Sequence, residues 1–199
     1  MICVFGVLKT KDGIKIRDEM LQWLEPLYDV LKIEQDPPGK LVEYPAIKFA
    51  CQSAIEMNEP VLYLHTKGAA NPNTWIQVPT RHVWKKEFGD KERAEKLFEI
   101  ARDCPDPMVV CPFSGTGRET WFNGFIINPK AAKILLENLK KPEECERHYY
   151  ERMFVSLKVR IFCSINRNCN GIKGVLTYLK YYMKENGLPF PTKPVTKSV

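Results

Sequence analysis

The chain has 199 residues, of which 44% are hydrophobic and 27% charged, and its formal net charge is +6. This length suits one well-buried domain and is too short for two ample ones. No apolar run approaches the roughly 20 residues that span a bilayer. The apolar N-terminus lacks the basic start and cleavage site of a signal peptide, so it is expected to be a first strand. Composition therefore predicts a globular protein that stays in the cytoplasm.

The seven cysteines argue against a disulfide framework. Their number is odd, and several lie in apolar segments, as expected for reduced core residues. No spacing among them gives the close pairs that a structural zinc site requires. Four of them are predicted to be buried: Cys3, Cys51, Cys111 and Cys163.

Alternating strands and helices are predicted for the first third of the chain. Five elements follow one another: a strand at 2–8, a helix capped by Asp12 that ends near Pro26, a strand at 28–34, a helix at 44–57 and a strand at 61–64. This β-α-β-α-β order predicts a parallel sheet with right-handed crossovers. The predicted fold class is α/β, with a single Rossmann-like, mostly parallel sheet flanked by helices.

The rest of the chain is less regular, and Pro79 is expected to interrupt any helix within 74–88. The other predicted elements are a helix at 91–103, a buried strand at 108–111, an aromatic strand at 121–128, a helix at 130–139, a helix opened by Pro142, a strand at 159–163 and a helix at 171–184. No repeat or domain linker is recognisable. The pattern extends the same α/β sheet.

The segment from Pro60 to Gly68 carries the first functional hypothesis. Four apolar residues without alternation predict an inner parallel strand, and ligands bind beyond the carboxyl ends of such strands. There Lys67 could neutralise a phosphate, Thr66 could donate to it, and Gly68 would allow close backbone approach. His65 belongs to the same strand end, and Arg81 downstream could fold over the ligand. The alternative is a strand that ends in ordinary surface polar residues.

Several familiar catalytic motifs do not occur in the sequence. There is no Walker A loop and no G-x-G-x-x-G after the first strand, which disfavours ATPases, kinases and dinucleotide-dependent enzymes. There is no H-E-x-x-H motif, no recognisable Ser/His/Asp set and no pair of carboxylates ending a strand. A dedicated divalent-metal site is therefore not expected from local motifs.

Two further segments could contact a sugar substrate. One is an aromatic strand that contains Trp121, Phe122, Asn123 and Gly124. Its aromatic rings could form an apolar surface for a sugar ring, and Asn123 could form a directional hydrogen bond. The alternative is that these aromatic residues are core. Downstream, Glu146 and Glu151 lie on a predicted helix, where either could accept a proton from a substrate hydroxyl, although most helix glutamates are solvated.

These motifs together resemble a known family. The His65-Thr66-Lys67-Gly68 motif, Trp75 and Arg81 downstream, and Trp121-Phe-Asn-Gly124 followed by a helix are similar to small glycosyltransferases of bacterial surface-polysaccharide synthesis, which have a GT-A-like fold. The similarity in element order covers about residues 2–165, and the H-T-K-G motif is its most specific part.

The resemblance implies a site that holds a nucleotide-diphosphate sugar. The donor would contact His65, Thr66, Lys67, Gly68 and Arg81. The sugar would contact Trp121, Asn123 and Gly124, and Glu146 or Glu151 would be the base. His65-Thr66-Lys67 stands where that fold usually has an Asp-x-Asp motif for Mn²⁺ or Mg²⁺. The expectation is therefore transfer without a tightly held metal, or a relative that binds a nucleotide sugar or carbohydrate without catalysis.

Charge separates the C-terminal end from the rest of the chain. From Lys158 onward, eight Lys and Arg residues oppose a single acid, Glu185, so this part carries +7 and the first 157 residues sum to −1. Residues 1–165 are predicted to form the α/β domain and 166–199 a basic helix and tail. The basic end suggests peripheral contact with an anionic membrane. No nucleic-acid-binding motif is recognisable.

Overall fold

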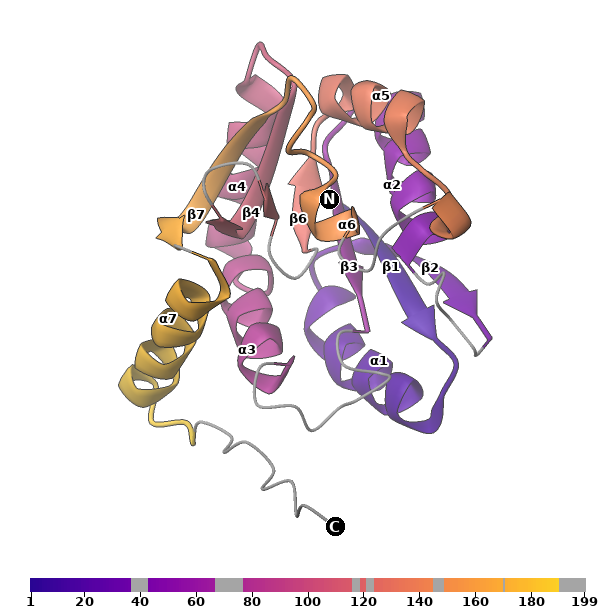
Figure 1. Ribbon diagram of the computed structural model, residues 1–199. Helices are drawn as coiled ribbons and strands as arrows, with labels where there is room; N and C mark the ends of the chain where they lie inside the picture. The colour runs from indigo at the N-terminus through magenta and orange to yellow at the C-terminus, as the bar shows by residue number, and fades with distance from the viewer. Residues whose placement is uncertain are drawn as a thin grey trace.

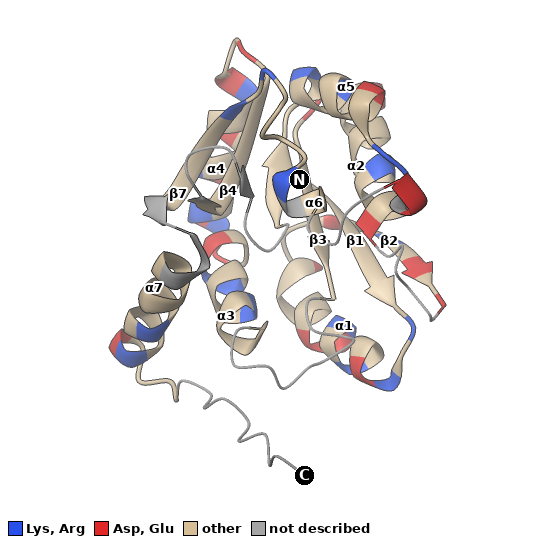
Figure 2. Ribbon diagram, viewed as in Figure 1, with Lys and Arg blue, Asp and Glu red and all other residues tan. Residues whose placement is uncertain are grey.

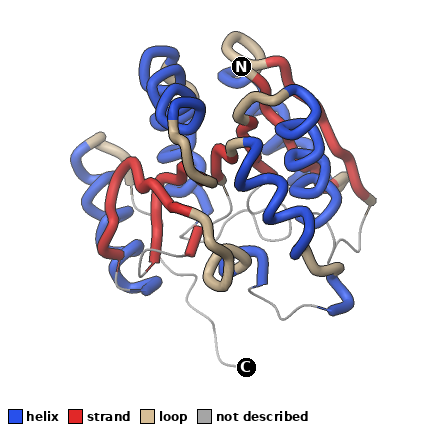
Figure 3. The backbone as a smooth tube through the Cα atoms, turned by 90° about the horizontal axis from the view of Figure 1, so that it is seen from above, coloured by secondary structure: helices blue, strands red, loops and turns tan. Residues whose placement is uncertain are grey.

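The computed structural model describes residues 1–36, 43–66, 77–115, 119–120, 124–144, 149–169 and 171–189. Helices cover both faces of one sheet (Figures 1 and 3). The elements are β1 (Ile2–Leu8), α1 (Lys11–Leu24), β2 (Asp29–Gln35), α2 (Glu43–Met57), β3 (Val61–His65), α3 (Gln77–Phe88), α4 (Lys91–Asp103), β4 (Met108–Gly115), β5 (Glu119–Thr120), β6 (Phe125–Ile127), α5 (Pro129–Asn138), the 3₁₀ turn η2 (Pro142–Glu144), α6 (Tyr149–Arg152), β7 (Arg160–Cys169) and α7 (Gly171–Glu185).

The sheet is mixed: in the described structure, three strand pairings are parallel and three are antiparallel. Its order is β2-β1-β3-β6-β4-β5, and β7 also pairs with β4. Strand β1 is parallel to β2 and β3, and β4 is parallel to β7, whereas β6 is antiparallel to both β3 and β4 and β5 is antiparallel to β4. Five strands therefore run one way and two the other. The predicted α/β class is confirmed, and the antiparallel β6 makes the sheet a mixed one.

Two apolar cores lie on the two faces of the sheet. One is formed with α1, α3, α4 and α7, and the other with α2, α5 and the segment after α6. Buried apolar side chains exclude water from both layers and supply the main driving force for folding. The four cysteines predicted to be core residues are buried thiols, and burial raises the pKa of the Cys51 thiol to about 12.

The turn between β1 and α1 is tight, and its cap differs from the predicted one. Thr10, not Asp12, caps α1: its hydroxyl oxygen accepts the Gly13 N–H at 3.0 Å. Asp12 lies in the first turn, where its charge favours the helix dipole. A Cβ at Gly13 would overlap the carbonyl oxygen of Leu8, so only glycine allows this close approach.

One prediction for the middle of the chain was wrong. Pro79 does not interrupt a helix, because it lies in the first turn of α3, where a backbone N–H has no intrahelical partner. The helix expected from Pro142 is described only at its two ends, as the turn η2 and the four-residue α6, and residues 145–148 between them lie outside the described residues. The predicted boundary after residue 165 falls within β7, and the following helix α7 contributes Leu179 and Met183 to the first core.

Within the described part of the chain, no helix has the length and apolar character that crossing a membrane requires.

Candidate functional site

The direction of the chain reverses between β1 and β3. From β1 the chain passes through α1 to β2, on one side of β1, and then through α2 to β3, on the other side. From β3 it continues away from β1 toward β4 (Figure 1). The connections that leave β1 and β3 thus diverge, which defines a topological switch point at their carboxyl ends. Open α/β sheets bind ligands at such a point.

Thr66 joins the two strands at this point. Its N–H donates to the carbonyl of Gly6 at 2.9 Å, and its hydroxyl oxygen accepts the Leu8 N–H at 3.1 Å. The side chain is only 3% exposed. Thr66 was predicted to donate to a phosphate, and the structure shows that its oxygen is engaged as an acceptor by β1. Its principal contact therefore fixes the spacing of the strand ends.

Thr66→Val should lower the free energy of unfolding by about 1–3 kcal/mol, because the isosteric side chain leaves the buried Leu8 N–H without its acceptor. Urea denaturation measures this loss. Thr66→Ser, which keeps the hydroxyl, should recover much of the stability. A valine variant as stable as the parent protein would show that this hydrogen bond contributes nothing.

His65 is held by protein groups on both ring nitrogens. Nδ1 lies 3.5 Å from Tyr63 Oη and Nε2 lies 3.5 Å from Glu43 Oε1, at the outer limit of hydrogen bonding. Burial, with further contributions from Glu43 and Tyr150, raises the pKa of Tyr63 well above its ordinary value. A protonated Tyr63 can donate to Nδ1, which leaves Nε2–H facing the Glu43 carboxylate.

Trp84 of α3 covers the same strand end. Its fully buried indole meets the His65 ring edge-on, with centroids 5.6 Å apart. A Cβ on Gly124 would lie 2.5 Å from Cε2 and Nε1 of Trp84, so Gly124 lets β6 begin directly against the indole. Gly124, predicted to contact a sugar, is buried against this core residue. Trp84 Nε1 and the buried Ser114 Oγ of β4 have no hydrogen-bond partner in the described structure.

The predicted site residues are only partly brought together by the described structure. His65 and Thr66 lie side by side at the switch point, whereas Arg81 lies on α3. Burial lowers the pKa of the Arg81 guanidinium, and the charge of Glu19 on α1 opposes this shift. The side chain of Glu151, in α6, is outside the described part of the structure. The other predicted residues also lie outside it: Lys67, Gly68, Trp121, Asn123 and Glu146.

Sequence reasoning missed Glu43 and Trp84. Glu43 is the first residue of α2, and nothing in the sequence relates it to His65, 22 positions later. Trp84 lies within 74–88, where Pro79 was expected to interrupt any helix, so no packing role was predicted for it. The one available signal for Glu43 was an acidic residue at a helix start, which is too common to identify a site.

The described residues do not form a metal centre. They contain no group of three or more His, Cys, Asp or Glu side chains that could hold an ion. At the switch point the described residues bring together one imidazole and one carboxylate, whereas Mg²⁺ and Mn²⁺ favour several oxygen ligands. The described donor set therefore does not fit a tightly held divalent cation.

No protein-family model, curated protein or solved structure matches the chain.

Proposed function

We propose that this chain binds a nucleotide-diphosphate sugar at the carboxyl ends of β1 and β3 and transfers the sugar to a glycan acceptor, in surface-polysaccharide synthesis. One observation carries the proposal: the His65-Thr66 strand end lies at the topological switch point of the sheet. The same residues begin the H-T-K-G motif on which the resemblance to GT-A-like glycosyltransferases rests.

Lys67 supplies the cation for the donor diphosphate in this proposal. During transfer, the bond between the sugar and the diphosphate oxygen breaks as the acceptor oxygen bonds to the anomeric carbon. Negative charge grows on the leaving diphosphate, and a positioned ammonium group stabilises that charge electrostatically. Arg81 is the second proposed cation. Glu146 or Glu151 accepts the proton from the acceptor hydroxyl.

His65 acts as a positioning residue in this account. Both of its ring nitrogens face protein groups, Tyr63 and Glu43, and its ring packs against Trp84. These contacts, together with the Thr66 hydrogen bond to β1, hold the end of β3 rigidly. A preorganised strand end favours a phosphate site formed by the residue that follows it in the sequence, which is Lys67.

A second candidate function is binding of a nucleotide sugar or carbohydrate without turnover. It is favoured by the sequence His65-Thr66-Lys67 where GT-A-like enzymes usually carry Asp-x-Asp, and by the described residues, which hold no group of three or more His, Cys, Asp or Glu that could bind a metal ion. The two functions can be told apart by whether nucleoside diphosphate is released. Release of nucleoside diphosphate in the presence of an acceptor supports transfer, and donor binding without release supports the binding protein.

Lys67→Ala should weaken donor binding about 10- to 100-fold, because hydrogen bonds to charged groups each contribute roughly 1.5–3 kcal/mol. Isothermal titration of the purified variant with the donor measures the change. Lys133→Ala is the matched control, since Lys133 is an exposed lysine on α5. Equal donor affinity in the Lys67 variant and the parent protein would remove Lys67 from the site.

Peripheral contact with an anionic membrane is a further part of the proposal. Tyr181 on α7 is 61% exposed and is flanked by Lys180, while Lys184 lies one turn beyond. Aromatic and basic side chains together favour the surface of anionic bilayers. Replacing both lysines by glutamate should abolish cosedimentation with phosphatidylglycerol vesicles, and unchanged cosedimentation would contradict the contact.

A further inference from the structure

A basic groove lies between α3, α4 and α7, outside the proposed donor site. Its volume is about 700 Å³, within the range of small-molecule sites. Its lining includes His82, Lys85 and Lys86 of α3, Arg93 and Lys96 of α4, and Tyr182 of α7. The three helices lie together in Figure 1, and Figure 2 shows basic positions along α3 and α7.

The groove and the His65 strand end lie on different faces of α3. Successive helix residues are rotated by about 100°, so His82 and Lys86 lie on the side of α3 opposite Trp84, and Lys85 lies about 100° from it. Trp84 faces the sheet and contacts His65, whereas the lysines are exposed. A ligand in the groove would therefore not contact the strand end.

Unpaired lysines give the groove a positive charge. In the described structure, Lys85, Lys86 and Lys96 form no ion pair with a carboxylate, while Arg93 is neutralised by the buried Glu87 at 2.7 Å. Two acidic residues also line the groove, Asp90 and Glu92. The Asp90 carboxylate accepts the Arg93 N–H at 2.9 Å as the N-cap of α4. The three lysines thus outnumber the two acids, and the groove is basic overall.

The pKa of His82 reflects the positive charge around it. Burial lowers the pKa of its imidazole below the ordinary value, the charges of Arg81 and Lys85 lower it further, and Glu19 opposes the shift. A nearby positive charge disfavours a second one, so the imidazole is neutral near pH 7. An anion bound beside it would remove this penalty and raise the pKa of His82.

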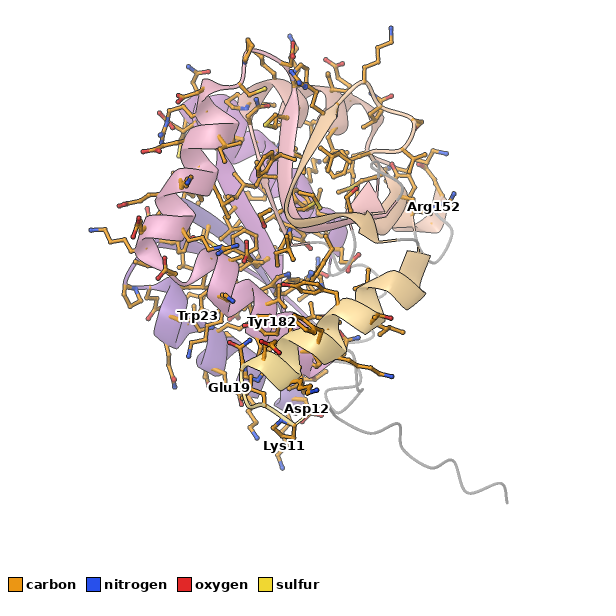
Figure 4. The ribbon with its side chains drawn as sticks, turned by 90° about the vertical axis from the view of Figure 1, so that its left-hand side faces the viewer. Lys11, Asp12, Glu19, Trp23, Arg152 and Tyr182 are labelled. Atoms are coloured by element: carbon orange, nitrogen blue, oxygen red, sulfur yellow. The ribbon has the colours of Figure 1, made fainter. Side chains whose placement is uncertain are left out.

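Tyr182 connects α7 to the other two helices. Its ring is buried, and the Lys86 ammonium group lies 5.1 Å from the ring centroid, a cation–π contact. Figure 4 shows Tyr182 on the side of α7 that meets the α3–α4 layer. Because α7 packs through Leu179 and Met183 into the core, the groove is a fixed feature of the fold.

We propose that this groove is a second binding site, specific for a phosphate or diphosphate group of a small molecule. Three lysine ammonium groups on two helices can surround a compact anion, and Tyr182 offers an aromatic wall to the group that carries the phosphate. The groove does not include the His65 strand end, whereas Arg81, the second proposed donor cation, adjoins His82 and its charge acts on the pKa of that histidine.

Histidine NMR tests the proposal, because the chain contains only three histidines. Their ring signals are followed through pH titrations with and without inorganic pyrophosphate, and His82→Gln assigns one of them. Binding should raise the pKa of His82 and leave that of His65 unchanged. The Lys85→Ala/Lys96→Ala double variant should weaken pyrophosphate binding at least about tenfold, whereas Lys67→Ala should not alter the His82 response.

The same His82 titration is repeated with vesicles that contain phosphatidic acid, because a phosphate group can come from a lipid as well as from a soluble molecule. A His82 response to vesicles alone would identify a headgroup as the source, and a response to pyrophosphate a soluble ligand. No response of His82 to either probe would overturn the proposal. So would an equal response in all three histidines, or one that the double variant leaves unchanged.

Discussion

Trp84→Ala should lower the free energy of unfolding by about 3–5 kcal/mol, the usual cost of removing a large buried aromatic side chain. Trp84 is fully buried, meets His65 edge-on and fills the space against which Gly124 packs. Its loss would leave a cavity between α3, the end of β3 and the start of β6. Urea denaturation of the variant and the parent protein measures the difference.

Trp23→Ala is the matched control. Trp23 of α1 is only partly buried at the edge of the same core, so its removal should cost clearly less. The proposed function adds a second expectation: Trp84→Ala should weaken donor binding through the strand end, although Trp84 lies in the core. Equal losses of stability in the two variants would contradict the account of Trp84 as the central packing residue of this edge.

Gly13→Ala should destabilise the protein by about 3 kcal/mol, although alanine in place of glycine normally stabilises a helix by about 1 kcal/mol. The new Cβ would overlap the carbonyl oxygen of Leu8, which is backbone and cannot rotate away. The end of β1 or the first turn of α1 would have to move. Thermal and urea denaturation both report the loss.

Lys15→Ala provides the control for this helix, since Lys15 is an exposed residue of α1 and its replacement should change stability by less than about 0.5 kcal/mol. Because Leu8 donates to Thr66, the displaced turn should also weaken donor binding in Gly13→Ala. A gain in stability with Gly13→Ala would contradict the tight β1–α1 turn.

Local patterns in the sequence predicted most of the first half of the fold. Helix α4 begins and ends where its apolar periodicity does, and the capping side chain of Asp90 explains its start. Strand β3 was recognised from its continuous apolar run. These elements follow from interactions between neighbours in the sequence, which a pattern can report.

The differences between the predicted and the observed structure come from contacts between segments that are distant in the sequence. Pro79 was expected to prevent a helix, but a proline in a first turn leaves a helix intact, and packing of Trp84 against the sheet favours α3. The partner of His65 on α2 depends on how that helix lies over the sheet. The basic groove joins three helices, and its Tyr182 lies 96 positions after Lys86, which it contacts, so no local pattern could predict it.

The central claim is tested most directly by thermal denaturation of the purified protein with UDP-, GDP-, CMP- and dTDP-sugars, each with Mn²⁺ and with EDTA. A donor at about 100 times its dissociation constant should add roughly 2.7 kcal/mol of stability, which a midpoint shift of several degrees reveals. The account predicts a shift with one nucleotide class that persists in EDTA and decreases strongly in Lys67→Ala. Unchanged midpoints with every donor, with and without metal, would contradict it.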